Sequence, residues 1–304
     1  MIPGIGINLP QDVTTIGEDG GRLRTFVAEA ESEGYSSLWV LESGVPGALD
    51  PLSVLAFAAA MSSRARLGVA VLLSGFRPPM QLAREIASLD RLSGGRFTVG
   101  VGLGNDPAQY ARYGLSVDHR GRHFEAGTIL LRRLLAEDRV TSVEPWWELE
   151  DVDRPLLATQ SPTPPIWYGA RQPAALDRAV RLGDGFIGAG SMSPADFEVA
   201  LARVRELLEV HGRDPADFTL AKRVYLHVGE PVPTTMDAVR AWFDHEYGKP
   251  ELADHCAVVG PPEVVAEHLS HLRAHGVTEL ILHPVVDLPE QRARLTRDVV
   301  PLLT

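Results

Sequence analysis

Glycines at the end of one predicted strand are the residues of this chain best suited to approach a ligand. Residues 96–101 alternate into a strand that ends in Gly100, Gly102 and Gly104. A glycine at the carboxyl end of a strand lets the backbone pass close to a flat molecule, or adopt a positive φ, where a Cβ would clash. The same spacing also fits a tight turn from strand to helix with no ligand.

A second candidate lies after the strand expected at residues 166–168. Gly169, Ala170 and Arg171 follow that strand, and Pro173 lies in the first turn of the next helix. Free backbone N–H groups at a helix start suit a phosphate, and Arg171 could add a charge-assisted hydrogen bond. In the alternative interpretation, Gly169 relieves crowding and Arg171 is a solvated charge.

The remaining polar residues at strand ends include Glu42, Ser43 and His283. The chain contains no HExxH, GxSxG or GxxxxGK[ST] motif, which disfavours hydrolytic and P-loop chemistry. Cys256 is the single cysteine, so neither an intrachain disulfide nor a cysteine metal cage is expected. We predict no metal site.

The chain repeats one unit, an amphipathic helix, a glycine and a short apolar strand. Gly34, Gly183 with Gly185, and Gly276 are the expected left-handed helix caps. Eight strands are expected, at residues 5–9, 37–41, 66–73, 97–101, 166–168, 186–187, 219–228 and 280–282. Strands that alternate with helices form a parallel sheet, and eight such units predict an α/β fold, a (β/α)₈ TIM barrel in one domain spanning residues 1–304.

One region breaks this pattern. Residues 138–165 are rich in proline and acidic residues and contain Trp146 and Trp147. We expect an insertion loop between the fourth and fifth strands that lies over the barrel mouth as an ordered lid. In the alternative, the tryptophans only pin this loop to the body of the protein.

Composition limits the partners. The chain has 304 residues, 45% of them hydrophobic, and a net charge of −11. An acidic chain lacks the basic face that nucleic acids require, and no apolar run is long enough for a membrane span. The amino terminus has no signal-peptide pattern, so a cytoplasmic location is expected.

Several motifs resemble the bacterial luciferase-like monooxygenase family, in the right order and over nearly the whole chain. They are LDRLSGGRF (89–97), GVGLG (100–104), RGRHFE (120–125), PPIWYGA (164–170), AVRLGDG (179–185) and VGPPEVV (259–265). The resemblance implies a (β/α)₈ barrel with an insertion. It also implies a cofactor, either reduced FMN used with oxygen or the deazaflavin coenzyme F420 used as a hydride carrier.

The resemblance also implies where that cofactor binds. The family has a non-proline cis peptide bond behind the cofactor ring, which corresponds here to Ala70-Val71. The expected cofactor-binding residues are Ala70, Val71, Leu103, Gly104 and Asn105 around the ring and its chain, and Gly169, Ala170 and Arg171 at the phosphate end.

One departure from the family bears on mechanism. Many members carry an acidic residue followed by a histidine after the second strand, whereas this chain has Glu42-Ser43. A serine does not exchange protons near neutral pH. We therefore expect the proton transfer of this catalytic position to involve Glu42, the substrate, water, or a histidine from another loop such as His283. Alternatively, Glu42 is a structural carboxylate bonded to backbone.

The sequences of these motifs resemble those of the deazaflavin-dependent branch of the family. The leading hypothesis is F420-dependent hydride transfer to or from a small organic substrate. The alternatives are an FMN-dependent two-component monooxygenase that needs a separate flavin reductase, and a non-catalytic flavin-binding barrel. Substrate choice is expected to depend on residues 138–165, Phe76, Tyr110 and Trp146, and family members often form homodimers.

Overall fold

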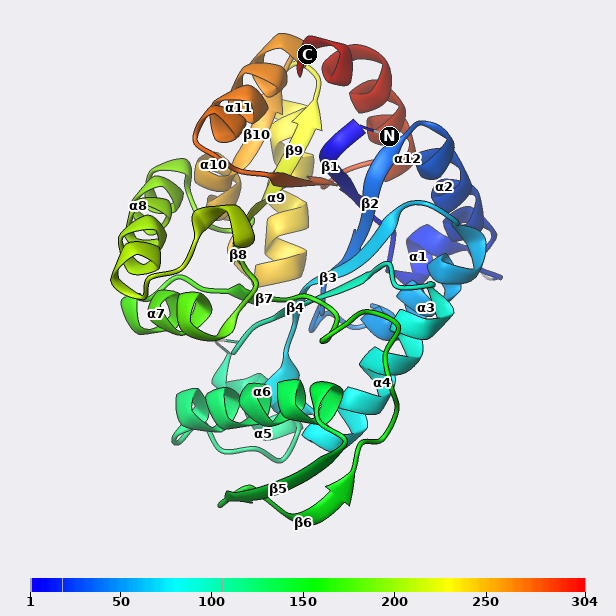
Figure 1. The fold of residues 1–304 in the computed structure, drawn as a ribbon. Coiled ribbons are helices and arrows are strands. Elements are labelled where there is room, and N and C mark those ends of the chain that lie inside the picture. Colours follow the sequence, from blue (N-terminus) through cyan, green and yellow to red (C-terminus); the bar gives the residue numbers. More distant parts are fainter. Residues whose placement is uncertain (1, 18, 105, 304) are drawn as a thin grey trace.

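The chain forms a closed barrel of eight parallel strands surrounded by helices (Figure 1). The computed structural model describes residues 2–17, 19–104 and 106–303. Around the barrel the order is β1-β2-β3-β4-β7-β8-β9-β11, and β11 closes the ring by pairing with β1. The predicted (β/α)₈ barrel is confirmed.

All eight predicted strands are present. They are β1 (Ile2–Asn8), β2 (Tyr35–Val40), β3 (Arg66–Leu72), β4 (Phe97–Val101), β7 (Ile166–Gly169), β8 (Gly185–Gly188), β9 (Thr219–Val228) and β11 (Glu279–Pro284). The sequence pattern did not indicate β10 (Ala257–Gly260), which pairs in parallel with the last residues of β9 outside the ring.

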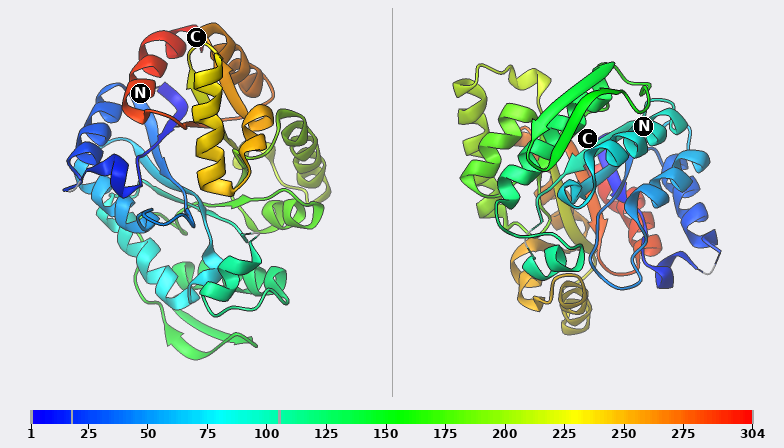
Figure 2. Two further views of the ribbon diagram at one scale, coloured as in Figure 1. Left: turned by 180° about the vertical axis from the view of Figure 1, so that it is seen from behind. Right: turned by 90° about the horizontal axis from the view of Figure 1, so that it is seen from below.

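Helices cover the outside of the barrel in both views of Figure 2. They are α1 (Val13–Ile16), α2 (Gly21–Ser32), α3 (Pro51–Met61), α4 (Pro79–Leu92), α5 (Pro107–Arg112), α6 (Arg120–Ala136), α7 (Pro173–Leu182), α8 (Pro194–Val210), α9 (Pro233–Tyr247), α10 (Ala253–Cys256), α11 (Pro262–Ala274) and α12 (Leu288–Arg294). Within the described part of the chain, no helix combines the length and apolar character that crossing a membrane requires.

The glycines expected to cap helices differ in their conformations. Gly34 and Gly276 have φ values of 93° and 76°, in the region that favours glycine, as predicted. The expectation is wrong for Gly183, whose φ is −95°. This glycine is needed for space instead, because a Cβ there would lie 2.7 Å from both the Tyr168 ring and the Ala179 carbonyl oxygen.

Two tryptophans fill the middle of the barrel. Trp39 of β2 and Trp167 of β7 are buried, and their rings stack with centroids 5.5 Å apart. Glycines on the neighbouring strands leave room for the Trp39 ring: a Cβ on Gly68 would lie 2.2 Å from it, and one on Gly6 2.5 Å. The barrel is therefore plugged at mid-height by aromatic packing, and polar groups collect above that layer.

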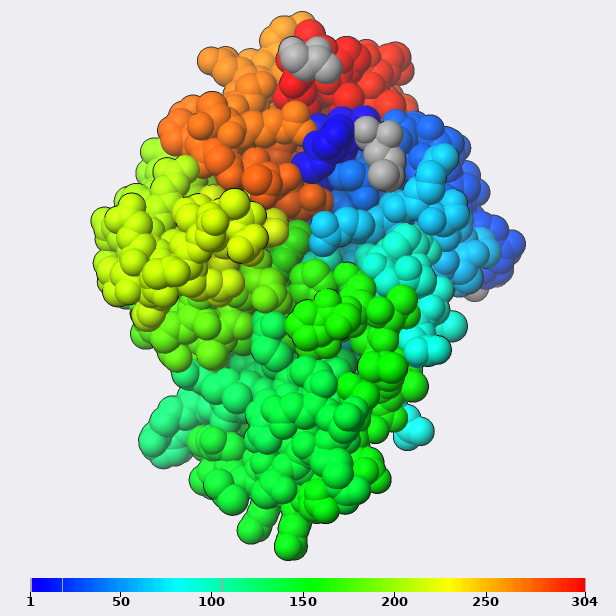
Figure 3. Space-filling model, in the orientation of Figure 1, coloured from blue at the N-terminus to red at the C-terminus, as the bar shows by residue number. Residues whose placement is uncertain are grey.

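The predicted lid is wrong. Residues 139–153 form an antiparallel hairpin, β5 (Arg139–Glu144) and β6 (Trp147–Asp153), at the edge of the molecule beyond α6 (Figure 1). Its green atoms project from one end of the space-filling view (Figure 3). The Trp147 ring packs so closely on α6 that a Cβ on Gly127 would lie 2.8 Å from it. The tryptophan thus pins the insertion to the body, as the alternative interpretation requires.

The rest of the insertion lies at the opposite end of the barrel from the mouth. The Gln160 side chain donates to the carbonyl of Phe97, the first residue of β4, at 2.7 Å. Asp90, fully buried at the end of α4, accepts from the backbone N–H of Thr159 at 2.6 Å and from that of Gln160 at 2.9 Å. The LDRLSGGRF motif therefore closes the amino-terminal end of the barrel.

The packing of Trp39 makes a prediction about stability. Gly68→Ala should lower the free energy of unfolding by about 1–3 kcal/mol, because the added methyl group overlaps the Trp39 ring in a filled interior. Chemical denaturation monitored by tryptophan fluorescence measures this change in the free energy of unfolding. The control is Gly121→Ala in α6, where a Cβ would be 3.7 Å from its nearest neighbour. Equal stability of the two variants would contradict the packing described above.

Candidate functional site

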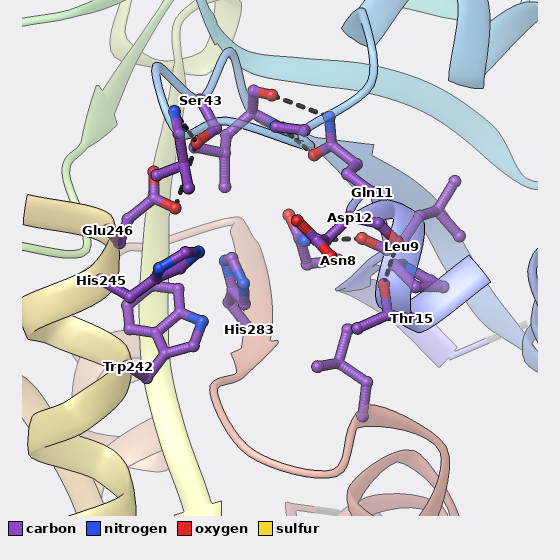
Figure 4. A pocket seen from close by; sticks show the side chains of 15 residues that line it. Asn8, Leu9, Gln11, Asp12, Thr15, Ser43, Trp242, His245, Glu246 and His283 are labelled. Carbon is purple, nitrogen blue, oxygen red and sulfur yellow. Dashed lines mark hydrogen bonds between the residues drawn. The ribbon is translucent and has the colours of Figure 1, made fainter. Parts of the chain in front are cut away.

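A pocket opens at the carboxyl ends of β1, β2 and β11, beside the last turns of α9 (Figure 4). Its cavity volume is about 100 Å³, and it opens to solvent. Its polar or aromatic lining residues include Asn8, Gln11, Asp12, Thr15, Ser43, Trp242, His245, Glu246 and His283. Carboxyl ends of barrel strands are where this fold places chemistry.

A buried arginine lies beneath this pocket. Arg223 of β9 is 3% exposed, and Nη1 donates to Oδ1 of Asn8 and to Nδ1 of His283, both at 2.8 Å. Nη2 donates to the carbonyl of Val40 at 3.1 Å and also to that of Ala70. All four acceptors are uncharged. One guanidinium therefore ties β9 to the ends of β1, β2, β3 and β11.

This arginine fixes the state of His283. An arginine has only donors, so Nδ1 of His283 must be the acceptor and the ring proton must be on Nε2. Burial lowers the pKa of His283 well below its usual value, and the Arg223 charge lowers it further. His283 is thus a neutral imidazole that offers an N–H donor. In this arrangement Nδ1 is already occupied by Arg223, and the ring presents Nε2–H to the pocket.

Ser43 occupies the position where the family usually has a histidine, and its hydroxyl reaches a carboxylate on α9. Its Oγ donates to Oε2 of Glu246 at 3.2 Å and accepts from the Val45 backbone N–H at 3.1 Å (Figure 4). Burial raises the pKa of Glu246, and the opposing effects of Ser43, Arg223 and His245 are smaller. Burial thus makes the Glu246 carboxyl group of this pocket easier to protonate than an ordinary glutamate.

Glu42 is held differently. Its Oε1 pairs with Arg77 Nη1 at 2.6 Å, and its Oε2 accepts from the backbone N–H of Leu73. Burial raises the pKa of Glu42, while Arg77 and the Leu73 N–H oppose that change. Both oxygens are engaged and one bonds to backbone, which is the arrangement that the structural alternative predicts.

The predicted non-proline cis peptide bond between Ala70 and Val71 is present. The half-buried Val71 side chain fits against two of the glycines at strand ends. A Cβ on Gly102 would lie 2.4 Å from Val71, and one on Gly169 would lie 2.8 Å from it. These two glycines thus make room for Val71, at the carboxyl end of the barrel.

The other predicted cofactor residues lie at the ends of β4 and β7, away from the lining of the pocket. The carbonyl of Leu103 accepts from the Tyr110 hydroxyl, and Gly104 has a φ of 74°. Asn105 lies outside the described residues. Ala170 is half-buried beside the core, and Phe76 packs on Tyr110 with ring centroids 4.8 Å apart.

Positive charge gathers at the start of α7. Arg171 is exposed, and its Nη2 donates to the carbonyl of Ser191 at 2.6 Å. Among the described contacts, the side chain of the N-cap residue Gln172 makes no capping hydrogen bond to α7. Nearby, burial lowers the pKa of Lys222 to about 7, and the charge of Arg171 lowers it further. A guanidinium beside the start of a helix suits an anionic group.

The comparison with known proteins identifies the family. The pattern described as luciferase-like monooxygenase matches residues 5–251. The chain belongs to the luciferase-like monooxygenase family. This confirms the resemblance seen in the sequence motifs, and the protein is a luciferase-like oxidoreductase.

Relatives in the luciferase-like family are of two kinds. The chain is 28% identical to an F420-dependent glucose-6-phosphate dehydrogenase of Kineococcus radiotolerans over 93% of both proteins. It is 29% identical to 4-hydroxyprotoasukamycin monooxygenase of Streptomyces nodosus subsp. asukaensis over 76% of this chain and 64% of that protein. A solved F420-dependent secondary alcohol dehydrogenase matches over the whole of both chains with a TM-score of 0.85 and 15% identity, which shows the shared barrel.

Sequence reasoning missed Glu246 and Arg223. Arg223 follows Lys222 inside an otherwise apolar strand, and two adjacent charges on one buried strand indicate that one of them points into the barrel. Glu246 gave no signal, because a carboxylate near the end of a polar helix is ordinary. Within the described residues, no group of three or more His, Cys, Asp or Glu side chains is placed to hold a metal ion.

The tautomer of His283 can be tested directly. With ¹⁵N-labelled histidine, His283 should show a protonated Nε2 and an unprotonated Nδ1, unchanged between about pH 5.5 and 8.5, because Arg223 occupies Nδ1. The His283→Gln spectrum assigns the signal, and exposed histidines that titrate serve as the internal reference. A His283 signal that titrates within this range would contradict the arrangement.

The structural role of Glu42 makes a second prediction. Glu42→Gln should lower the free energy of unfolding by about 1–3 kcal/mol, because an amide NH₂ must then face either Arg77 or the Leu73 N–H. Glu137→Gln is the matched control, since its pair with Arg133 is exposed on α6 and should change stability by less than about 1 kcal/mol. Equal losses in urea denaturation would show that Glu42 is not a structural carboxylate.

Proposed function

We propose that this protein is a deazaflavin-dependent oxidoreductase that transfers hydride between coenzyme F420 and a small organic substrate. The observation that carries the proposal is the pocket at the carboxyl end of the barrel, lined by His283 and Glu246, to which Arg223 ties the Ala70 carbonyl. The similarity to the F420-dependent dehydrogenase over 93% of both chains supports F420 as the cofactor.

The residues at the barrel mouth fit such a cofactor. Val71 offers an apolar surface beside Gly102 and Gly169, and the start of α7 with Arg171 offers donors for an anionic tail. The proposed cofactor-binding residues are Ala70, Val71, Leu103, Gly104, Asn105, Gly169, Ala170 and Arg171. When bound, a deazaflavin supplies a carbon centre that accepts or gives hydride.

The residues of the pocket then have separate tasks. Trp242 and Leu288 give apolar contact for a substrate, while His283 gives a hydrogen-bond donor that stays neutral. Arg223 keeps His283 and Asn8 fixed beside the Ala70 carbonyl. Glu42 holds Arg77 and the turn after β3 in place, which supports the cis peptide segment.

The second candidate is an FMN-dependent monooxygenase that receives reduced flavin from a separate reductase. The 29% identity to 4-hydroxyprotoasukamycin monooxygenase supports it. Two solved relatives of the same fold are also described as monooxygenases, one of them as an oxygenating constituent in complex with FMN. Such an enzyme requires oxygen, whereas hydride transfer to or from a deazaflavin does not.

Titration with each cofactor tests the proposal. F420 should bind more tightly than FMN when binding is followed by cofactor fluorescence, and turnover with F420 should persist without oxygen. Arg171→Gln should weaken binding about tenfold, because one charge-assisted hydrogen bond is lost. Arg203→Gln, on the outer face of α8, is the control.

Each other result has a clear meaning. Tighter binding of FMN together with turnover that stops without oxygen would favour the monooxygenase. Binding of F420 with no substrate oxidation or reduction under any condition would indicate a non-catalytic barrel. Failure of both cofactors to bind would refute the assigned binding residues.

A further inference from the structure

We propose that Glu246, held by Ser43, exchanges a proton with the oxygen of an alcohol or carbonyl substrate, while Nε2–H of His283 donates a hydrogen bond to the same oxygen. This inference rests on the proposed hydride-transfer function and names the substrate class of that site. It also assigns the proton chemistry that the replacement of histidine by Ser43 leaves open.

The first step is the availability of Glu246. Among the described residues its side chain has a single hydrogen-bond partner, Ser43 Oγ on Oε2. Glu246 also lines the pocket, so Oε1 is left for a ligand. Glu42, the other buried carboxylate of the region, has both oxygens engaged by Arg77 and Leu73.

The second step is the complementary donor. With Nδ1 of His283 accepting from Arg223, Nε2 carries the proton, and it has no partner among the described residues. The ring is held in place by Tyr225 and Trp242, with centroid distances of 5.0 and 5.3 Å. The pocket therefore combines a carboxyl group with a fixed neutral N–H, a pair that matches one oxygen able to gain or lose a proton.

The third step is the chemistry. In the oxidation of a secondary alcohol, the O–H bond breaks and its proton passes to the Glu246 carboxylate. The adjacent C–H bond breaks and its electron pair leaves as hydride to the oxidised deazaflavin, so a C=O bond forms and the alcohol loses two electrons. In the reverse direction protonated Glu246 returns the proton to the carbonyl oxygen, and the donor His283 polarises that carbonyl.

The charges around Glu246 set the direction of its pH dependence. Arg223 on β9 and His245 on α9 lower its pKa, and Tyr225, Tyr247 and Asp12 are the other ionisable groups of the cluster. Burial dominates and raises the pKa of Glu246. Alcohol oxidation, which needs the carboxylate, should therefore increase with pH through this ionisation, and ketone reduction should decrease.

The test uses the F420-loaded enzyme with cyclohexanol and cyclohexanone in single-turnover experiments across pH. The wild type should oxidise cyclohexanol at a rate that rises through one ionisation. Glu246→Gln should lower that rate by about 100-fold or more and abolish the rise, with unchanged F420 affinity by fluorescence. Ser43→Ala, which removes a hydrogen bond that lowers the pKa of Glu246, should move the midpoint to higher pH.

Two further variants and one spectroscopic measurement complete the design. Asp244→Asn, exposed on the same helix, should behave like the wild type. His245→Gln should retain the increase of the cyclohexanol oxidation rate with pH. In ¹³C NMR of labelled glutamate, assigned with Glu246→Gln, the Glu246 carboxyl should titrate above the usual glutamate range. Cyclohexanone should move this titration to higher pH, because a carbonyl accepts a hydrogen bond only from the protonated form.

The outcomes separate this inference from the proposed function. Absence of F420 binding would refute both. With F420 bound, the inference is overturned if cyclohexanol is not oxidised, if cyclohexanone leaves the Glu246 titration unmoved, or if Glu246→Gln keeps the wild-type rate. It is also overturned if His245→Gln, rather than Glu246→Gln, abolishes the pH dependence.

Discussion

The buried guanidinium of Arg223 is the constraint on which the mouth of this barrel depends. A charge removed from water is costly unless it is hydrogen-bonded, and both Nη atoms of Arg223 donate to uncharged acceptors, four in all, from four strands. Its position follows from the alternation of β9, in which Arg223 points into the barrel and Lys222 outward to Ala189 and Met192. The Arg223 side chain thereby fixes the position of the Ala70 carbonyl and the tautomer of His283.

The layers below this guanidinium explain why it sits so high in the barrel. Trp39 and Trp167 fill the middle of the interior. The adjacent strands carry glycines there, because a larger residue would overlap the Trp39 ring. At the amino-terminal end, Glu279 accepts from Ser37 and Trp39. Arg223, Asn8 and His283 therefore form a buried polar layer between the tryptophans and the pocket.

Much of this architecture could be predicted from the sequence, because parallel strands buried on both faces read as apolar runs between amphipathic helices. The cis peptide bond followed from the family motif. The hairpin of residues 139–153 could not be read in advance, since acidic residues mask its alternation and only Val140 and Ser142 of β5 are buried. Glu246 was equally hidden, because its importance comes from meeting Ser43 across 203 positions of the chain.

In the proposed mechanism, the exchange of histidine for serine after β2 moves the proton-bearing group of the site from the end of a strand to a helix. A serine hydroxyl is small enough to accept from Val45 and donate to Glu246 at once. Helix α9 is in turn placed by aromatic packing, in which Trp242 and Phe243 contact Tyr225, two residues beyond Arg223. The same strand that fixes His283 therefore also fixes the helix that carries Glu246. The placement of His283 relative to Glu246 therefore depends on β9. A change in the packing of β9 would move the His283 donor and the Glu246 carboxyl group together.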